Sequence, residues 1–387
     1  MRAAAGVQPG LMTVAREWAR IGCIGFGGPP AHIALLRQLC VERRRWLDAR
    51  QFEEAIAACN LLPGPASTQL AIFCAWRLRG RVGALLGGVC FIVPGLILIL
   101  ALASLFLAGS PPTWLKGAGA GAGAAVAAVA VQAGSNLVPD SWRRTATRAR
   151  WLAYLAAGAA SAATVGPWLV LVLLGCGLCE LVVQRLRRAR SQLAAITPLP
   201  LLAVAMGSGG GLLALCWVAF KVGALSYGGG FVIIPLMQAD AVDHYHWMTA
   251  SQFLNAVALG QVTPGPVVQT VAVVGYAAAG VGGGILAALI AFSPSFAFIL
   301  LGATHFDRLR ANEDARAFLN GAGPAAIGAI LGTAVPLARA LSEPWQYGVL
   351  AGAAVMLFAL RRGVVLTLLL AAAAGAVVAL SGGPLPH

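Results

Sequence analysis

Two short stretches of this 387-residue chain combine the residue types that an anion site needs. The first runs from Asn60 to Gln69 through Pro63, Gly64, Pro65, Ser67 and Thr68, and the second from Gln261 to Thr270 through Thr263, Pro264, Gly265, Pro266 and Gln269. A Pro-Gly-Pro cannot lie inside an uninterrupted helix, because each Pro removes an N–H and clashes with the preceding turn. Pro is well tolerated at the first helical position, so each stretch predicts the start of a half-helix. The unpaired N–H groups at such a start favour an anion.

Both stretches lie within apolar sequence, so the breaks would lie inside a membrane. In a membrane, irregular backbone survives only where protein buries it or where it lines a wet cavity. Two such breaks, one in each half of a chain, indicate a transporter's substrate site. The neighbouring hydroxyl and amide groups would donate hydrogen bonds to a small oxyanion. The alternative is that each Pro-Gly-Pro is a packing kink, and the duplication described below favours the site.

Glycine turns are the second candidate for substrate binding. They contain Gly27 and Gly28 in the first half, and Tyr227, Gly228 and Gly229 in the second. Adjacent glycines allow the backbone to approach a ligand closely and can form an anion-binding nest. They are equally common where membrane helices pack tightly. The sequence leaves both interpretations open.

Two basic residues, Arg20 and Lys221, precede these turns at matching positions. A cation inside an apolar run is expensive to keep there, so a pair of inward cations could attract a dianion. The alternative is that both side chains reach to the membrane interface. His32 follows the first glycine turn and could titrate, although a lone His is more often a packing residue.

The composition identifies the class of protein that carries these motifs. Hydrophobic residues make up 59% of the chain and charged residues only 10%, whereas soluble proteins carry roughly 25% charged residues. The apolar runs 82–108 and 117–138 are long enough to cross a bilayer. We therefore expect an all-α polytopic membrane protein whose partner is the lipid bilayer. The net charge of +14 fits the orientation signal of membrane proteins, so no nucleic-acid partner is expected.

The chain contains an internal duplication. A shift of 201 residues aligns 21–100 with 222–301 without a gap, and twenty of these 80 positions are identical. The identities include Gly22/Gly223, Trp46/Trp247, Phe52/Phe253 and the whole Pro-Gly-Pro. Identity at Trp, Pro and Gly is difficult to obtain from apolar bias alone. An internal repeat decides the architecture, so we expect two homologous halves.

The basic residues predict that the two halves point in opposite directions. The first half carries Arg37, Arg43, Arg44, Arg45, Arg50, Arg77, Arg79 and Arg81 in two loops, whereas the matching stretches 238–251 and 278–282 contain no Lys or Arg. Cytoplasmic loops of membrane proteins are the basic ones. The reversed bias therefore predicts an inverted-topology repeat.

A topology with broken, re-entrant helices accounts for these charges. Segments 11–36 and 55–76 would enter the membrane and return, and spans would follow near 82–108, 117–138, 151–165 and 167–184. A short crossing near 193–206 would lead to the inverted second half, with spans near 284–304, 318–338, 345–360 and 363–381. Continuous spanning by 11–28 or 55–76 is the alternative.

Signs of an enzyme or a metal site are weak. Cys176-x-x-Cys179 lacks a second ligand pair, and His244-x-His246 beside Asp240 and Asp243 lacks a further spaced ligand. No H-E-x-x-H, G-x-S-x-G or P-loop pattern is present. We therefore expect no catalytic residue, no metal and no cofactor.

The ordered motifs resemble the chromate ion transporter (CHR) family. They are Gly25-Phe26-Gly27-Gly28-Pro29, Trp46-Leu47, Phe52, Leu62-Pro63-Gly64-Pro65 and Phe91-Ile92-Val93-Pro94, followed in the second half by Tyr227 to Gly230, Trp247, Phe253 and Thr263 to Pro266. The resemblance covers about 10–337. Ser226 and Tyr227 depart from the family's pattern, and so does Arg79-Gly80-Arg81.

The resemblance implies a two-domain, multi-pass transporter that exports chromate across the bacterial inner membrane and confers chromate resistance. Residues 1–192 would form the first family repeat and 193–387 the second, inverted one. Sulfate is implied as an analogue that could compete, and a homodimer is left open. The alternatives are a sulfate or other oxyanion transporter of the same fold and, from other classes, a passive anion channel or an intramembrane enzyme.

Overall fold

The computed structural model describes residues 9–386 except 60–61, 63, 109–110, 144–146, 165–168, 190–210, 227–230 and 304–311. Every regular element within these ranges is a helix, which confirms the all-α prediction. Five segments are long and apolar enough to cross a membrane: Ala66–Phe106, Thr113–Arg143, Leu169–Arg187, Val267–Gly302 and Glu313–Arg339. The protein is therefore a polytopic membrane protein. The predicted crossing near 193–206 lies outside the described residues.

The order of the helices in the first half recurs in the second. The first half contains α1 (Leu11–Ile24), α2 (Pro29–Arg37), the π-helix η1 (Gln38–Arg43), α3 (Ala49–Cys59), α4 (Ala66–Phe106), α5 (Thr113–Arg143), α6 (Arg148–Thr164) and α7 (Leu169–Ala189). The second contains α8 (Leu212–Leu225), α9 (Ile233–Gln238), the π-helix η3 (Ala239–His244), α10 (Ala250–Val262), the 3₁₀-helix η4 (Val267–Gln269), α11 (Thr270–Gly302), α13 (Glu313–Gly332), α14 (Ala334–Arg339), α15 (Pro344–Ala354), the π-helix η6 (Val355–Ala359) and α16 (Val364–Leu380).

The repeat extends to single hydrogen bonds in the loops after the π-helices. The Trp46 N–H donates to the Cys40 carbonyl at 2.8 Å, and the Trp247 N–H donates to the Ala241 carbonyl at the same distance. The residue before each Trp has a left-handed backbone, with φ of 51° at Arg45 and 53° at His246. This conformation is uncommon for a residue with a side chain, so its recurrence supports a structural duplication.

The helix that follows each Pro-Gly-Pro turns back on itself. In α4 the break is at Arg79 and Gly80, where Gly80 has φ 61°, and in α11 it is at Ala279 and Gly280, where Gly280 has φ 63°. A Cβ on Gly87 would lie 2.5 Å from that of Ala75, so the two limbs of α4 pack side by side as a hairpin. Because α3 ends at Cys59 and α4 begins at Ala66, the helix is broken at the Pro-Gly-Pro, as predicted. Whether segment 55–76 crosses the membrane or returns stays a prediction.

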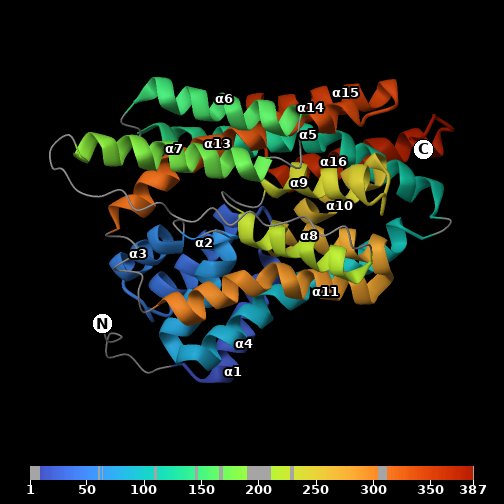
Figure 1. Cartoon of the computed structure of the whole chain (residues 1–387). Helices are drawn as coiled ribbons and strands as arrows, with labels where there is room; N and C mark the ends of the chain where they lie inside the picture. The colour runs from blue at the N-terminus through green and yellow to red at the C-terminus, as the bar shows by residue number, and fades with distance from the viewer. Residues whose placement is uncertain are drawn as a thin grey trace.

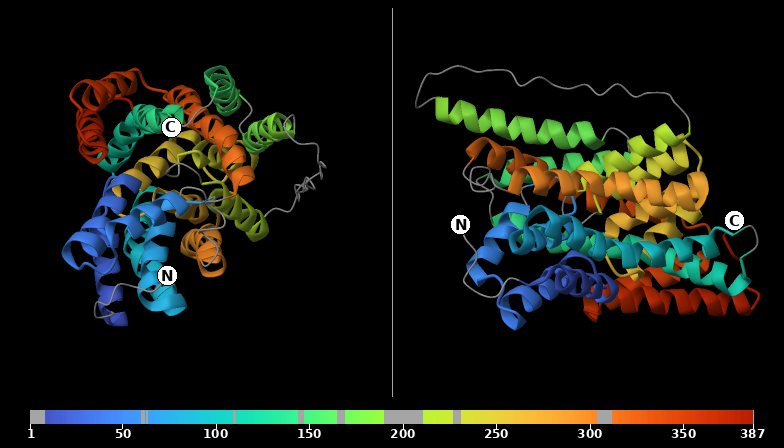
Figure 2. Two further views of the ribbon diagram at one scale, coloured as in Figure 1. Left: turned by 90° about the vertical axis from the view of Figure 1, so that its left-hand side faces the viewer. Right: turned by 90° about the horizontal axis from the view of Figure 1, so that it is seen from below.

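The helices form two layers whose axes are roughly parallel (Figures 1 and 2). Figure 1 shows α1, α4, α8 and α11 in the lower layer and α5, α6, α7 and α13–α16 in the upper one, with α9 and α10 between them. In the left view of Figure 2 many of these helices are seen close to end-on.

The two halves interlock instead of packing as separate units. Helices α4 and α11 contact one another, α5 packs against α16, and α13 packs against α6 and α7. A Cβ on Gly88 of α4 would meet the Phe296 ring, and one on Gly284 of α11 would meet Leu100. These two contacts require the second limbs of α4 and α11 to run in opposite directions. Orientation relative to a membrane stays a prediction.

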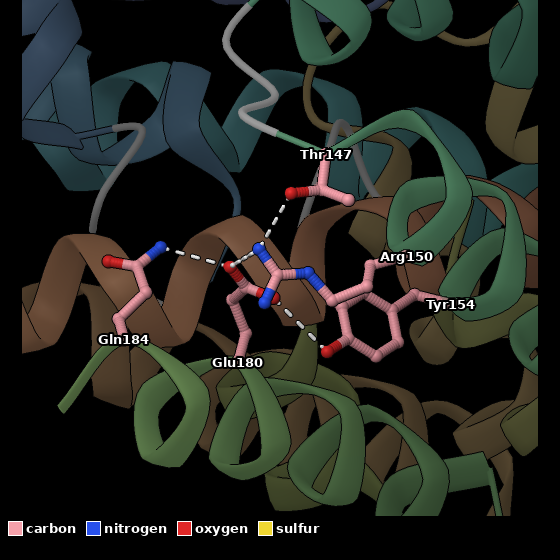
Figure 3. A network of polar contacts seen from close by, with 5 residues as sticks. All are labelled: Thr147, Arg150, Tyr154, Glu180 and Gln184. Atoms are coloured by element: carbon pink, nitrogen blue, oxygen red, sulfur yellow. Dashed lines mark hydrogen bonds and ion pairs between the residues drawn. The ribbon is translucent and has the colours of Figure 1, made fainter. Parts of the chain in front are cut away.

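A polar network joins α6 and α7 (Figure 3). The Glu180 carboxylate accepts from the Tyr154 hydroxyl at 3.1 Å and from the Gln184 amide at 3.0 Å, and the Arg150 guanidinium lies 3.4 Å away. Glu180 is buried, so these partners replace the water that its charge would otherwise require. Arg185, also on α7, forms an ion pair with Asp314 of α13. Both acidic side chains therefore hold helices together.

We expect a methyl group at Gly328 to destabilise the contact between α13 and α6. A Cβ there would lie 1.9 Å from the Leu155 carbonyl oxygen, and the backbone cannot move aside cheaply. Gly328→Ala should lower the free energy of unfolding by about 1–3 kcal/mol. The matched control is Gly348→Ala on α15, where nothing lies within 4 Å. It should be neutral or stabilising, as for an exposed helical position. Denaturant unfolding in detergent distinguishes the two, and equal stability would contradict this packing.

Candidate functional site

Both Pro-Gly-Pro breaks produce helix starts that no described side chain caps. Pro65 precedes α4 and Pro266 precedes η4, and each residue has an extended backbone without a side-chain capping bond. The glycines between the prolines have φ of 117° at Gly64 and 104° at Gly265, a region that favours glycine. The first backbone N–H groups of both helices therefore remain available at the breaks.

Each break is packed against the long helix of the other half. A Cβ on Gly64 would lie 3.3 Å from Ser295 Oγ of α11. The Gln269 amide donates to the Ile92 carbonyl of α4 at 2.7 Å. A Cβ on Gly95 would lie 2.1 Å from the Pro264 carbonyl oxygen, so only glycine allows this approach. The two halves thus exchange contacts around the breaks.

The first glycine turn lies against the second break. The Gly265 N–H donates to the Gly25 carbonyl at 3.0 Å. A Cβ on Gly28 would lie 3.6 Å from the Val267 side chain. The helix start after Gly28 therefore lies close to the one after Pro266. Gly27 has φ 96° and Gly28 has φ 73°, so both predicted glycines adopt the left-handed backbone that this turn needs.

His32 connects the glycine turn to the first half-helix. Its Nε2 lies 2.8 Å from the Gly25 carbonyl oxygen, which requires Nε2 to carry the proton. Its Nδ1 then accepts from the Ser67 hydroxyl at 3.3 Å. The ring is fully buried and packs edge-on against Phe91, with ring centroids 5.1 Å apart. His32 therefore fixes the orientation of Ser67.

Four buried donors near the breaks have no hydrogen-bond partner among the described residues. They are the hydroxyls of Thr68, Ser226 and Ser295 and the amide nitrogen of Gln261. The three hydroxyl residues are 0% exposed and Gln261 is 7% exposed. An unsatisfied buried donor costs about 1–3 kcal/mol, so each of these groups would be stabilised by a ligand that accepts a hydrogen bond. A ligand that accepts from several sides would satisfy them.

Other predicted site residues stabilise the breaks themselves. The Thr263 hydroxyl donates to the Leu259 carbonyl and the Thr270 hydroxyl to the Val267 carbonyl, both at 2.8 Å. Gln69 is fully buried, and a Cβ on Gly64 would lie 2.5 Å from its amide nitrogen. Asn60, Pro63, Tyr227, Gly228 and Gly229 lie outside the described residues.

The two predicted cations make their contacts elsewhere. Lys221 Nζ lies 2.6 Å from Asp240 Oδ2 and 5.9 Å from the centre of the Trp217 ring. The Lys221 charge is therefore already balanced by a buried carboxylate. The Arg20 side chain is 57% exposed and lies 4.0 Å from Glu17. Asp240, considered above for a metal site, is instead the partner of Lys221.

Sequence reasoning did not identify Ser295, Gly95 or the Gly25 carbonyl as parts of this site. One signal was available for Ser295, because the shift of 201 residues aligns it with Pro94, at the end of the Phe91-to-Pro94 motif. The other two act through close backbone approach, which residue type alone does not reveal. The assembled site combines backbone N–H groups, hydroxyls and amides, which is a neutral donor set suited to an anion.

Comparison with known proteins shows the family of this chain. The chromate transporter family model matches residues 12–181 and 213–377. The chain belongs to the chromate transporter family. It is 32% identical to the chromate transport protein of Cupriavidus metallidurans over 85% of this chain and 83% of that protein. It is 31% identical to the chromate transport protein of Pseudomonas aeruginosa over 84% and 81% of the two chains. No solved structure matches the chain.

If the unpaired hydroxyls bind substrate, removing them should affect binding without affecting folding. Thr68→Val and Ser295→Ala delete donors that have no partner among the described residues, so the unfolding midpoint should not fall. Loss of one hydrogen bond to a charged ligand should weaken chromate binding about tenfold to a hundredfold. Titration calorimetry on the purified protein measures the affinity. The control Thr333→Val removes a hydroxyl that donates to the Ala329 carbonyl, and it should leave chromate affinity unchanged. Unchanged affinity in Thr68→Val and Ser295→Ala would exclude these hydroxyls from the site.

Lys221 and Asp240 should behave as a structural pair. Lys221→Met leaves a buried carboxylate without its cation, and such a change costs about 3–5 kcal/mol. The double variant Lys221→Met/Asp240→Leu removes both charges, so we expect its stability and transport to return close to those of the wild type. Thermal unfolding and vesicle transport test this pair. Recovered stability without transport would instead assign Lys221 to the substrate.

Proposed function

We propose that this protein is a secondary transporter that exports chromate from the cytoplasm across the bacterial inner membrane. The proposal rests on one observation above all: unpaired buried donors and uncapped helix starts of both halves gather at the Pro-Gly-Pro breaks. Membership of the chromate transporter family and the names of its relatives support the choice of substrate. The relatives are named as transport proteins, which favours transport over catalysis.

The donor set suits a tetrahedral dianion. Four oxygens accept hydrogen bonds on every side, and the donors approach from α4, α10 and α11 as well as from Ser226 after α8. Helix N-termini stabilise negative charge without a cation, so the anion need not be trapped by a full salt bridge. We therefore assign substrate binding to Thr68, Gln261 and Ser295.

An inverted repeat would give this site alternating access. The second limbs of α4 and α11 run in opposite directions, and each break is packed against the long helix of the other half. In transporters of this type, two inverted halves rock around a site near the centre of the membrane. The reversed basic loops of the two halves support the same arrangement.

The membrane potential favours export. Moving one charge across the membrane changes its free energy by about 2.3 kcal/mol per 100 mV, so expelling a dianion from an inside-negative cell gains about 4–5 kcal/mol. The potential alone could therefore drive export. Proton coupling is not required for the direction that we propose.

Everted membrane vesicles containing the full-length protein test this function. The cytoplasmic face of the membrane is on the outside of such vesicles, so export from cells corresponds to uptake into them. We expect energised uptake of labelled chromate, which excess sulfate inhibits and an uncoupler stops. Vesicles carrying Thr68→Val/Ser295→Ala, with equal protein in the membrane, should take up at least tenfold less chromate at low concentration. Uptake equal to that of empty vesicles would overturn the chromate assignment. Sulfate uptake without chromate uptake would indicate a sulfate transporter with this fold, and large unitary currents would indicate a channel.

A further inference from the structure

A second group of charged residues lies away from the central site, on the outer side of α1. It lines a pocket of about 630 Å³ that contains four arginines, Arg16, Arg20, Arg43 and Arg44, together with Glu17 and Met12. The proposed transport mechanism uses none of these side chains. The chemistry of this pocket therefore requires its own explanation.

Two elements build the pocket. Arg16, Glu17 and Arg20 lie on one face of α1, because residues three or four positions apart on a helix are neighbours. Arg43 ends the π-helix η1, and Arg44 follows it. Arg44 is held in place by Glu17, whose Oε1 lies 2.7 Å from its Nη2, and by the Trp46 ring 5.7 Å away. The position of at least one guanidinium is thus fixed before any ligand binds.

The charges of the pocket are not balanced. Four arginines and one glutamate leave a formal charge of three positive units. Glu17 is 8% exposed, and among the described residues it forms ion pairs with Arg44 and Arg20. Neither Arg16 nor Arg43 forms an ion pair with any described acidic residue. Like charges that line one pocket repel one another, and an anion between them would relieve the repulsion.

The second half lacks this charge excess at the equivalent place. The shift of 201 residues aligns Arg16, Arg43 and Arg44 with Trp217, His244 and Tyr245. The remaining cation there, Lys221, is paired with Asp240. The duplicated fold therefore forms the same α-helix and π-helix without the arginines. Arg43 and Arg44 belong to the basic loops that predict the orientation of the first half, and their convergence with Arg16 and Arg20 in one pocket is a further feature of this half.

We propose that this pocket binds a phosphate-type tetrahedral oxyanion group, either as a free ion or as the headgroup of an anionic lipid. The planar guanidinium presents two parallel N–H groups that match two oxygens of such a group, and several arginines enclose it from different sides. The pocket is larger than a free oxyanion, which leaves room for the rest of a headgroup. Met12 at its edge is 81% exposed, an apolar surface suited to an acyl chain. Basic clusters at a membrane surface attract anionic lipids.

Binding is measured in the Thr68→Val/Ser295→Ala background, so that the central site does not contribute. One arm titrates sulfate and inorganic phosphate into the protein in phosphatidylcholine nanodiscs. The other arm counts bound phosphatidylglycerol by native mass spectrometry. Arg16→Gln/Arg43→Gln is compared with the control Arg81→Gln/Arg362→Gln, which removes two exposed arginines outside the pocket. Arg43→Gln alone serves as a second variant if the double change impairs folding.

We expect Arg16→Gln/Arg43→Gln to weaken binding at least tenfold in one arm, with the control within twofold of the parent. A loss in the lipid arm identifies the headgroup as the source, and a loss in the ion arm identifies a free oxyanion. Equal binding by both charge variants in both arms would overturn the proposal, as would no binding of either probe by the parent. Because the readout compares binding by the pocket variant and the control variant in one background, its result does not depend on whether the protein transports chromate.

Discussion

The need to satisfy backbone groups where helices break inside an apolar protein governs this structure. Water is absent from the core of a membrane, so exposed N–H groups at a helix start need a protein partner or a ligand. At the Pro-Gly-Pro breaks, the Gly265 N–H donates to the Gly25 carbonyl. The helix starts at Ala66 and Val267 have no side-chain cap. The hydroxyls of Thr68, Ser226 and Ser295 likewise have no hydrogen-bond partner among the described residues. An anion is the ligand that such a surface stabilises best.

The interlocking of the halves follows from the same constraint. Each break is packed against the other half's long helix, so neither half could complete the site alone. Glycine permits this at Gly95, where any side chain would collide with the Pro264 carbonyl. The charged residues pair between helices: Glu180 and Asp314 join helices, and Asp240 neutralises Lys221. A neutral centre with charges elsewhere is consistent with binding a dianion that must also be released.

Much of this architecture could be predicted from the sequence, because Pro, Gly and charge act locally. The helix starts at Pro65 and Pro266 and the glycine turn at Gly27 were predicted, and the helices agree with them. The pairing of Lys221 with Asp240 was not, because it depends on how α8 and η3 pack. The same holds for Ser295 and for His32, whose bond to Ser67 joins two distant segments. Residue type predicted the breaks, but only the packing of the two halves brings their side chains together.

Locating the anion is the most direct test of the central claim that helix starts from both halves hold one oxyanion. Selenate has the shape and charge of chromate, and its selenium is identified by anomalous diffraction from crystals of the full-length protein. The structure predicts one selenium peak within hydrogen-bonding reach of Thr68 and of the helix starts after Pro65 and Pro266. A peak beside only one break, or at the arginine pocket alone, would contradict a shared site between the two halves.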